Sequence, residues 1–331
     1  MLKLKSFLSP KIVCLVVALL FLFCMPVFAN RRILNIAIVT LMYILMGQSW
    51  NVLSGMAGMF NIVPSMFFGL GAYCMTLTTY VGGANWFVGV LVGFAVNAAM
   101  ASLVGFIGSK LSGLYFTMAL IGLFQTIFAI FIQWGTLTGG YMGISMPKQY
   151  LLTKPQQYYI ILGLVLLAMA LFMTLRRSRI GTNFVALKEN PELAISLGSN
   201  IHAWRILATI ISACMASTAG AFYAFFLMAT TPNVFASTIS LKTMMVVMIG
   251  GVGHVFGPVL GSFMIVLDEI VRGMMPSRFA AFSVIIYAAV LILMTLLRPR
   301  GLITIFDKSK GMDIGKTLLD AFRVETKNPT S

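Results

Sequence analysis

Acidic residues are scarce in this sequence. Only 8 of its 331 residues are Asp or Glu, and the first of them is Glu189. Charged residues of both signs make up 9% of the chain, whereas a soluble domain carries roughly 25%. Because so few charges cannot cover a water-exposed surface, the composition excludes a soluble globular protein.

Residues that bind metals or form disulfides are also few. The chain has 4 cysteines, none in a CxxC spacing, and 2 histidines. The cysteines lie inside apolar stretches, where Cys behaves as a small packing residue. We therefore expect no metal site. Paired carboxylates, a His cluster and a Ser/His/Asp set are missing as well, so the sequence does not indicate an enzyme.

Long apolar runs dominate the sequence instead. A helix needs roughly 20 apolar residues to cross the hydrocarbon core of a membrane. Only helices and closed barrels satisfy the backbone in lipid, and these runs are too uniformly apolar for alternating barrel strands. The predicted fold is an all-α polytopic membrane protein. The runs lie at residues 12–29, 33–53, 58–80, 86–107, 111–134, 157–175, 203–229, 239–271 and 280–297.

The number of spans depends on the run 239–271, which is long for one helix and contains the sequence GGVGHVFGP at 250–258. Two spans there give about ten transmembrane helices, and one tilted span gives nine. Basic residues favour cytoplasmic loops, so Arg176, Arg177 and Arg179 place the loop 176–202 in the cytoplasm. Ten spans then leave the N- and C-termini both cytoplasmic. We predict a transmembrane domain over 1–302 and a polar cytoplasmic tail over 303–331.

The net charge of +15 does not indicate nucleic-acid binding. The basic residues cluster at the ends of the apolar runs, as in other membrane proteins. The tail sequence GMDIGKT, at 311–317, has three residues between its first Gly and Gly-Lys-Thr, where a phosphate-binding loop has four. We therefore expect neither a nucleic-acid partner nor a nucleotide bound to this chain.

The polar stretch KENPELAISLG, at 188–198, predicts a short helix. Asn190 suits the N-cap position and Pro191 the first turn. Glu192 opposes the helix dipole, and Gly198 can form the left-handed turn that ends a helix. A helix over 191–197 has only about two turns, too few to be stable alone in water. It must pack either on the protein's own surface or in a groove of a separate cytoplasmic subunit.

Five stretches together resemble one family. They are GLYFTMALIGLFQ at 113–125, TGGYMGI at 138–144, SRIGTNFVALKENPELAISLGSN at 178–200, TPNVFASTISL running into MVVMIGGVGHVFGPVLGS, and RPRGL at 298–302. In this order they resemble the LivM-type permease subunit of bacterial branched-chain amino acid ABC importers. The likeness covers most of the chain from about residue 45 to 302.

The resemblance implies a function, partners and a location. The chain would be a non-enzymatic permease of the bacterial inner membrane that imports branched-chain or similar neutral amino acids. ATP and Mg²⁺ would bind two cytoplasmic ABC ATPase subunits, and this chain would bind no cofactor. Other partners would be a second, LivH-like permease, a periplasmic amino-acid-binding protein and membrane lipid. The coupling element to the ATPases would comprise Glu189, Asn190, Glu192, Leu193, Ala194, Leu197 and Gly198.

Polar and small residues inside the apolar runs are candidates for a substrate path. Interrupted helices in both halves of a transporter often form its site, and the stretches 51–73 and 250–258 are rich in Gly and contain Pro. The alternative is that polar groups tie helices together and that small residues allow close packing. The candidate residues are Gln48, Asn51, Gly55, Gly58, Asn61, Gln125, Gly250, Gly251 and Gly253.

Some features leave the substrate open. The stretch 59–64 differs from the Gln-Leu-Ser-Leu-Gly-His common in the family, as do Tyr141 and Met142 in their motif. Urea or short amides are therefore alternative substrates. An ion-coupled secondary transporter is a further alternative, although that class needs a titratable group in the membrane. We expect Lys242 to extend to the interface. Asp268 and Glu269 are expected to form an exposed ion pair with Arg272, and contact with a periplasmic binding protein is the alternative.

Overall fold

The structure is a computed structural model and describes residues 23, 25–26, 29–80, 82–111, 113–146, 152–196, 199–274 and 302. Most of the first predicted span and the last predicted span, over 280–297, lie outside these residues. The tail 303–331 and most of the RPRGL motif do so too. The count of ten spans therefore stays a prediction.

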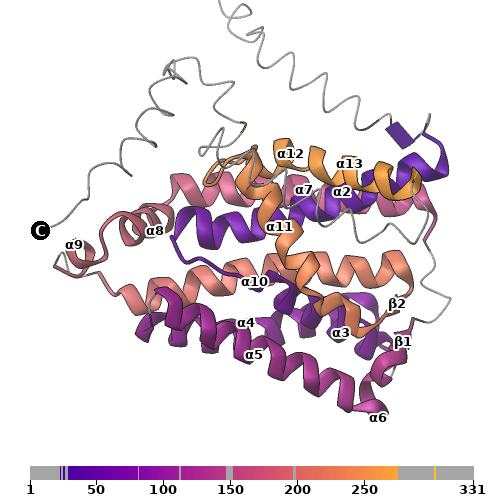
Figure 1. Ribbon diagram of the computed structural model, residues 1–331, viewed down its shortest axis with the longest axis horizontal. Helices are drawn as coiled ribbons and strands as arrows, with labels where there is room; N and C mark the ends of the chain where they lie inside the picture. The colour runs from indigo at the N-terminus through magenta and orange to yellow at the C-terminus, as the bar shows by residue number, and fades with distance from the viewer. Residues whose placement is uncertain are drawn as a thin grey trace, which may run out of the picture.

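The described residues are almost all helical (Figure 1). Five helices are long and apolar enough to cross a membrane, counting the π-helix with α2. The elements are α2 (Arg31–Trp50), a π-helix (Asn51–Met56), α3 (Pro64–Tyr80), α4 (Trp86–Lys110), α5 (Gly113–Gln133), α6 (Gly135–Thr138), a 3₁₀ turn (Gly140–Met142), β1 (Ile144–Ser145), α7 (Lys154–Arg177), α8 (Arg179–Glu189), α9 (Pro191–Ser196), α10 (Ile201–Leu227), β2 (Ala229–Thr230), a 3₁₀ turn (Pro232–Phe235), α11 (Ser237–Gly250), α12 (Gly257–Gly261) and α13 (Phe263–Met274).

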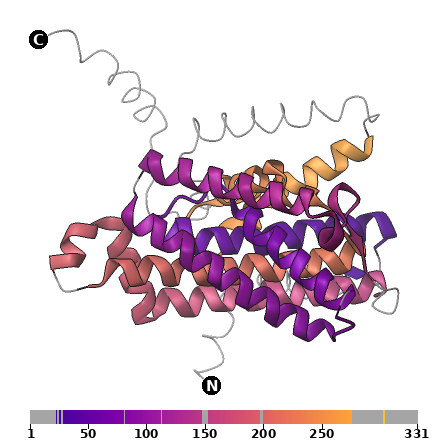
Figure 2. The same cartoon turned by 90° about the horizontal axis from the view of Figure 1, so that it is seen from below.

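The long helices run side by side, so that the connections gather at two opposite ends (Figures 1 and 2). One end carries α8 and α9, and we call it the α9 end. The other carries α6 and the antiparallel pair of β1 and β2, in which Ile144 lies opposite Thr230. Residues 135–146 and the helices α8 and α9 thus lie at different ends of the bundle.

Small residues let α3 and α10 approach closely. A Cβ added to Gly71 would lie 2.4 Å from the backbone oxygen of Ser217, and one on Gly220 would lie 1.9 Å from that of Phe68. Asn97 of α4 donates to Ser217 Oγ at 3.0 Å, which adds a third helix to this contact. Glycine contacts and polar bonds of this kind hold helices together in lipid. The predicted alternative of close small-residue packing is therefore correct for α3.

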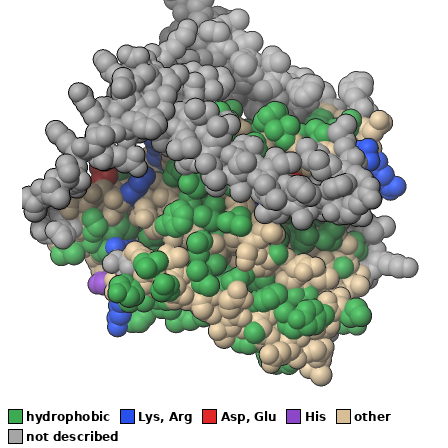
Figure 3. Space-filling model, in the orientation of Figure 1, with side chains coloured by type: hydrophobic (Ala, Val, Ile, Leu, Met, Phe, Trp, Pro, Cys, Tyr) green, Lys and Arg blue, Asp and Glu red, His purple; other side chains and the backbone are tan. Residues whose placement is uncertain are grey.

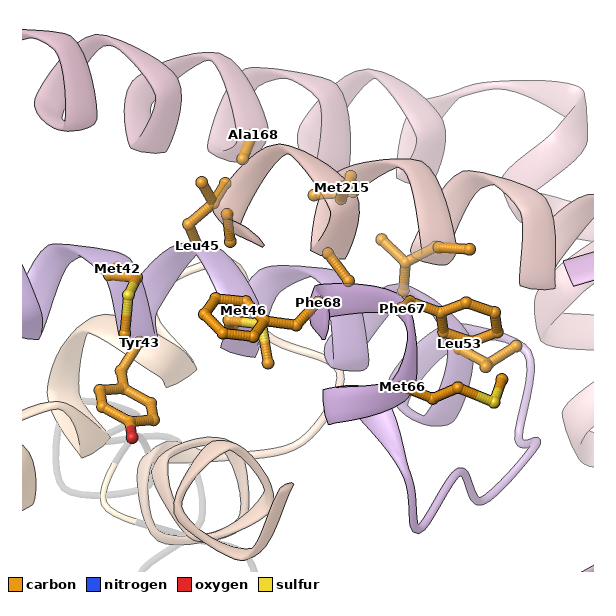
Figure 4. Packing of buried hydrophobic residues seen from close by; sticks show 14 of the residues in the cluster. Met42, Tyr43, Leu45, Met46, Leu53, Met66, Phe67, Phe68, Ala168 and Met215 are labelled. Atoms are coloured by element: carbon orange, nitrogen blue, oxygen red, sulfur yellow. The ribbon is translucent and has the colours of Figure 1, made fainter. Parts of the chain in front are cut away.

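The apolar core surrounds α2 and α3, which pack on α10 and α7. Met46, Phe68 and Tyr158 have no exposed surface. Because these side chains come from α2, α3 and α7, the core joins helices that are far apart in sequence. Figure 4 shows part of it, with Met42, Tyr43, Leu45, Met46, Leu53, Met66, Phe67, Phe68, Ala168 and Met215 labelled.

The predicted break in the run 239–271 is confirmed. The helix α11 ends at Gly250, and the chain turns back through the segment 251–256 into α12 and α13. A Cβ on Gly250 would lie 1.7 Å from the oxygen of Gly257, and one on Gly261 the same distance from the oxygen of Val246. The helices α11 and α12 lie so close together that only glycine fits at both contacts. This close approach explains why the motif contains several glycines.

The expected exposure of the ion pair at Asp268 was wrong, because the carboxylate is buried. Lys242 Nζ lies 2.7 Å from Asp268 Oδ2, with the side chains 14% and 0% exposed. The side chain of Arg272 lies outside the described residues. The Lys242 ammonium also lies 5.8 Å from the ring centroid of Tyr43. Buried charges are stable only when they are paired, so this ion pair joins α11 to α13 inside the bundle.

Candidate functional site

The two interrupted segments meet, although about 200 residues separate them in sequence. Asn51 Oδ1 accepts from the backbone N–H of Gly253 at 2.7 Å, and Asn51 Nδ2 donates to the oxygen of His254 at 2.9 Å. Gln48 Nε2 donates to the oxygen of Val255 at 2.5 Å. Gln48 and Asn51 are three apart on a helix and so share a face. Their carboxamides thus bind three successive residues of the segment 251–256.

Glycines allow the π-helix and the segment 251–256 to approach each other closely. A Cβ on Gly55 would lie 2.3 Å from Asn51 Oδ1 and 2.9 Å from the nitrogen of Gly253. Gly253 itself has φ +80°, a conformation that glycine adopts without strain. Gly55 and Gly253 are therefore required by the geometry of the junction, and we call residues 48–55 with 251–256 the junction.

Asn61 shapes the turn that follows the π-helix. Its Oδ1 accepts from the N–H of Val63 at 2.9 Å, and its backbone oxygen accepts from Trp50 Nε1 at 2.7 Å. Ser54 Oγ lies 3.3 Å from the nitrogen of Asn61. These bonds satisfy polar groups in a non-helical stretch of the bundle, so the role of Asn61 in this structure is to hold the turn.

The remaining path candidates divide into two groups. Gly250 and Gly251 lie at the end of α11 and lead into the junction. Gln125 does not join the others, because it lies exposed on α5, a helix that packs against α4, α6 and the turn Pro232–Phe235. The structure therefore brings Gln48, Asn51, Gly55 and the glycines of 250–253 together and leaves Gln125 apart.

The carboxamide of Gln48 is only half used. Gln48 is fully buried, and its Oε1 accepts no hydrogen bond from the described residues. A buried acceptor without a donor is costly in a protein interior. The junction thus contains a polar oxygen available to an N–H group.

Two basic residues reach the junction from the loop 176–202. Lys188 Nζ donates to the backbone oxygen of Gly55 at 2.9 Å, and Arg176 donates to that of Gly253 at 3.4 Å. Gly58 lies directly beneath Lys188, since a Cβ there would lie 2.8 Å from Lys188 Cγ. Sequence reasoning missed both contacts: the two residues looked like ordinary loop charges, and only the fold brings them to the glycines.

The short helix predicted over 191–197 is present as α9, over Pro191–Ser196. Asn190 is extended, as a residue before proline should be, and its backbone oxygen accepts from the N–H of Ala194. Ala194 is 6% exposed, whereas Ile195 beside it is 60% exposed. The helix therefore packs one face on the protein and leaves an apolar residue outside. Glu189 is exposed; Leu197, Gly198 and the side chains of Glu192 and Leu193 lie outside the described residues.

The helix α8 was not predicted. It begins at Ser178, whose Oγ accepts from the N–H of Gly181, and it buries Phe184 and Leu187. The ring of Phe184 packs edge-on against Trp204 of α10 at 6.2 Å. The period of three between buried positions is helical, but the polar residues between them hide it in a stretch that looks like a loop.

The distribution of charge fits a membrane protein. Apolar side chains cover much of the face in Figure 3, and the basic side chains lie toward the ends of the helices. Among the described residues, no group of three His, Cys, Asp or Glu side chains could hold a metal ion. Apolar helices, a glycine-rich junction between broken segments and a short helix at one end define a multi-pass membrane permease.

The family of this permease follows from comparison with known proteins. Residues 32–295 match the family described as branched-chain amino acid transport system / permease component, and the chain belongs to that family. The matched range contains α2 from its second residue and every later element through α13. The expected resemblance to LivM-type permeases is thereby confirmed.

Several curated relatives are similar over most of their length. The chain is 26% identical to the high-affinity branched-chain amino acid transport system permease protein LivM of Escherichia coli K12 over 84% of this chain and 71% of LivM. It is 26% identical to the autoinducer 2 import system permease protein LsrC of E. coli O157:H7, over 76% and 77%. It is 23% identical to the permease protein LivH of E. coli K12, over 79% and 91%. No solved structure matches it significantly.

Proposed function

We propose that this chain is the transmembrane permease subunit of an ATP-driven importer that carries branched-chain or similar neutral amino acids into the cell. The observation that carries this proposal is the family match over residues 32–295. In this proposal two cytoplasmic ABC ATPases bind ATP and Mg²⁺, and this chain binds no cofactor. A periplasmic amino-acid-binding protein delivers the substrate to the inner membrane.

A second, different permease completes the proposed importer. LivM and LivH of E. coli carry the same system name, high-affinity branched-chain amino acid transport, and this chain is similar to both. Two distinct permeases in one system favour a heterodimer of this chain with a LivH-like subunit.

The proposed substrate path passes the junction. A zwitterion needs polar groups that do not hold it tightly, and uncharged carboxamides meet that need better than full charges. The free Oε1 of Gln48 suits an ammonium group, because it is buried and accepts no bond from the described chain. We place Gln48, Asn51, Gly55 and the glycines of 250–253 on the path, with Gly58 and Asn61 shaping its end. Gln125 is not part of it.

The proposed coupling element is α9 with its flanks, from Glu189 to Gly198, on the cytoplasmic side. Ile195 supports this role, because its apolar side chain is exposed next to the well-buried Ala194. A two-turn helix that is packed on one side and apolar on the other is suited to fit a groove in an ATPase subunit. Docking of α9 would then connect ATP-driven closure to the bundle.

The test is reconstitution of the chain in liposomes with its partner permease, both ATPases and the binding protein. Leucine or valine is expected to stimulate ATP hydrolysis and to accumulate inside. If only urea or acetamide stimulates ATP hydrolysis, the substrate is a short amide and not an amino acid. Because the chain is similar to LsrC, autoinducer 2 is tested as a further candidate substrate. Uptake driven by an ion gradient without ATP would overturn the proposed function.

A further inference from the structure

The loop 176–202 contacts both halves of the junction through cations. Lys188, in the last turn of α8, donates to Gly55 of the π-helix at 2.9 Å. Arg176, in the last turn of α7, donates to Gly253 of the segment 251–256 at 3.4 Å. Each acceptor is a backbone oxygen, and the carboxamide of Asn51 joins the same two segments.

The position of Gly55 explains why its oxygen accepts a cation. The π-helix ends at Met56, so Gly55 is among the last residues of the helix, whose carbonyls have no partner further along it. The end of the helix also carries partial negative charge. A lysine ammonium in this place both satisfies the oxygen and opposes the dipole, as an ordinary C-terminal cap does, but it comes from another helix.

Close packing fixes the lysine on this carbonyl. Gly58 has φ +71°, and a Cβ there would lie 2.8 Å from Lys188 Cγ and 3.1 Å from Lys188 Cα. The backbone of α8 therefore lies directly on the turn after the π-helix. The bond from Lys188 to Gly55 is partly buried as a result, which shields it from water and salt.

Lys188 lies in the last turn of α8, which is directly connected to α9. The N–H of Asn190 bonds to the oxygen of Ala186 at 3.0 Å, and the N–H of Ala194 bonds to the oxygen of Asn190 at 3.1 Å. These bonds run without a gap from the last turn of α8 into the first turn of α9. Only Asn190 stands between α8 and α9, so no loop separates Lys188 from α9.

We propose that Lys188 is a positioning residue that connects the motion of α9 to the junction, by capping the π-helix at Gly55 while Arg176 holds Gly253. This inference rests on the proposed function. In the conformation described, the two cations hold the broken segments together. When an ATPase moves α9, Lys188 leaves Gly55, the cap is lost and the junction is free to separate. A bond that must break and re-form suits the flexible stem of lysine.

The substitution Lys188→Met tests the idea, because it keeps the apolar stem and removes the ammonium. In the reconstituted importer we expect the ATP hydrolysed per substrate molecule transported to rise about three- to tenfold, the range for losing one partly exposed charged hydrogen bond. Lys188→Arg keeps a donor and should restore most of the coupling. Lys110→Met is the matched control, because Lys110 also lies in the last turn of a helix but contacts the ring of Phe106 instead.

The readout separates coupling from folding. A purely structural role would lower ATP hydrolysis and uptake in proportion and leave their ratio unchanged, which would overturn the inference. An unchanged ratio in a fully active Lys188→Met importer would overturn it too. If the wild-type importer itself shows no ATP-dependent uptake, the proposed function fails, and this inference fails with it. If the wild-type importer and the Lys188→Met variant couple ATP hydrolysis to uptake equally well, the role of Lys188 is rejected and the proposed function stands.

Discussion

The Asn51 carboxamide both accepts and donates a hydrogen bond, which a charged side chain could not do in its place. It accepts from the N–H of Gly253 and donates to the oxygen of His254. Aspartate would accept but could not donate, and it would add a buried charge, which is costly without a partner. The neutral amide can therefore join the two broken segments without adding a buried charge.

The substitution Gly55→Ala should disrupt this bond. The new Cβ would lie 2.3 Å from Asn51 Oδ1 and 2.9 Å from the nitrogen of Gly253, both parts of packed structure. Overpacking of this kind costs about 1–3 kcal/mol, so we expect a lower thermal unfolding midpoint in detergent and slower transport.

The control for this prediction is Gly122→Ala. A Cβ on Gly122 would meet nothing within 4 Å, and the residue lies on the exposed face of α5. Alanine is favoured over glycine in a helix by up to about 1 kcal/mol, so the control should be unchanged or slightly more stable. Equal stability of the two variants would show that the close contact at Gly55 is not present in solution.

At the scale of elements, the sequence predicted those helices and helix ends that depend on a local pattern of residues. The apolar runs that lie within the described residues form helices, the break at GGVGHVFGP is real, and α9 begins at Pro191 as its capping residues indicated. The π-helix over 51–56 was not predicted, because its sequence differs little from that of an α-helix. The bonds of Lys188 and Asp268 were not predicted either, because their partners are brought near only by the packing of distant helices.

The ion pair of Lys242 and Asp268 is the clearest such case, and it can be tested by a double-mutant cycle. Lys242→Met leaves the fully buried carboxylate of Asp268 without its ammonium partner. Removing one member of a buried pair costs roughly 3–5 kcal/mol, so the unfolding midpoint of this variant, and of Asp268→Asn, should fall clearly.

The double variant decides whether the loss comes from the pair. Lys242→Met combined with Asp268→Asn removes both charges, and it should recover most of the stability lost in Lys242→Met. Lys110→Met, at an exposed lysine, should have little effect. Strictly additive losses in the double variant would mean that the two side chains do not stabilise each other.

At the scale of the whole molecule, the two ends of the bundle differ in character. The α9 end has the short helix α9 and the cations Lys188 and Arg176, which contact the junction. The opposite end has α6, the strand pair and a 3₁₀ turn in which Tyr141 and Met142 are exposed. An importer needs such asymmetry, because in the proposed assembly one end meets ATPases and the other a binding protein.

This asymmetry predicts which residues are accessible from each side of the membrane. In a variant whose four native cysteines are replaced, Tyr141→Cys should react with a membrane-impermeant maleimide in intact spheroplasts, because Tyr141 is 78% exposed at the end opposite α9. Ile195→Cys, also exposed, should react only in inverted vesicles or after permeabilisation. Among the described residues one helix long and apolar enough to cross a membrane, α7, separates the two positions, so we expect them on opposite faces. Reaction of Ile195→Cys in intact spheroplasts would place α9 outside and remove it from the reach of any cytoplasmic ATPase.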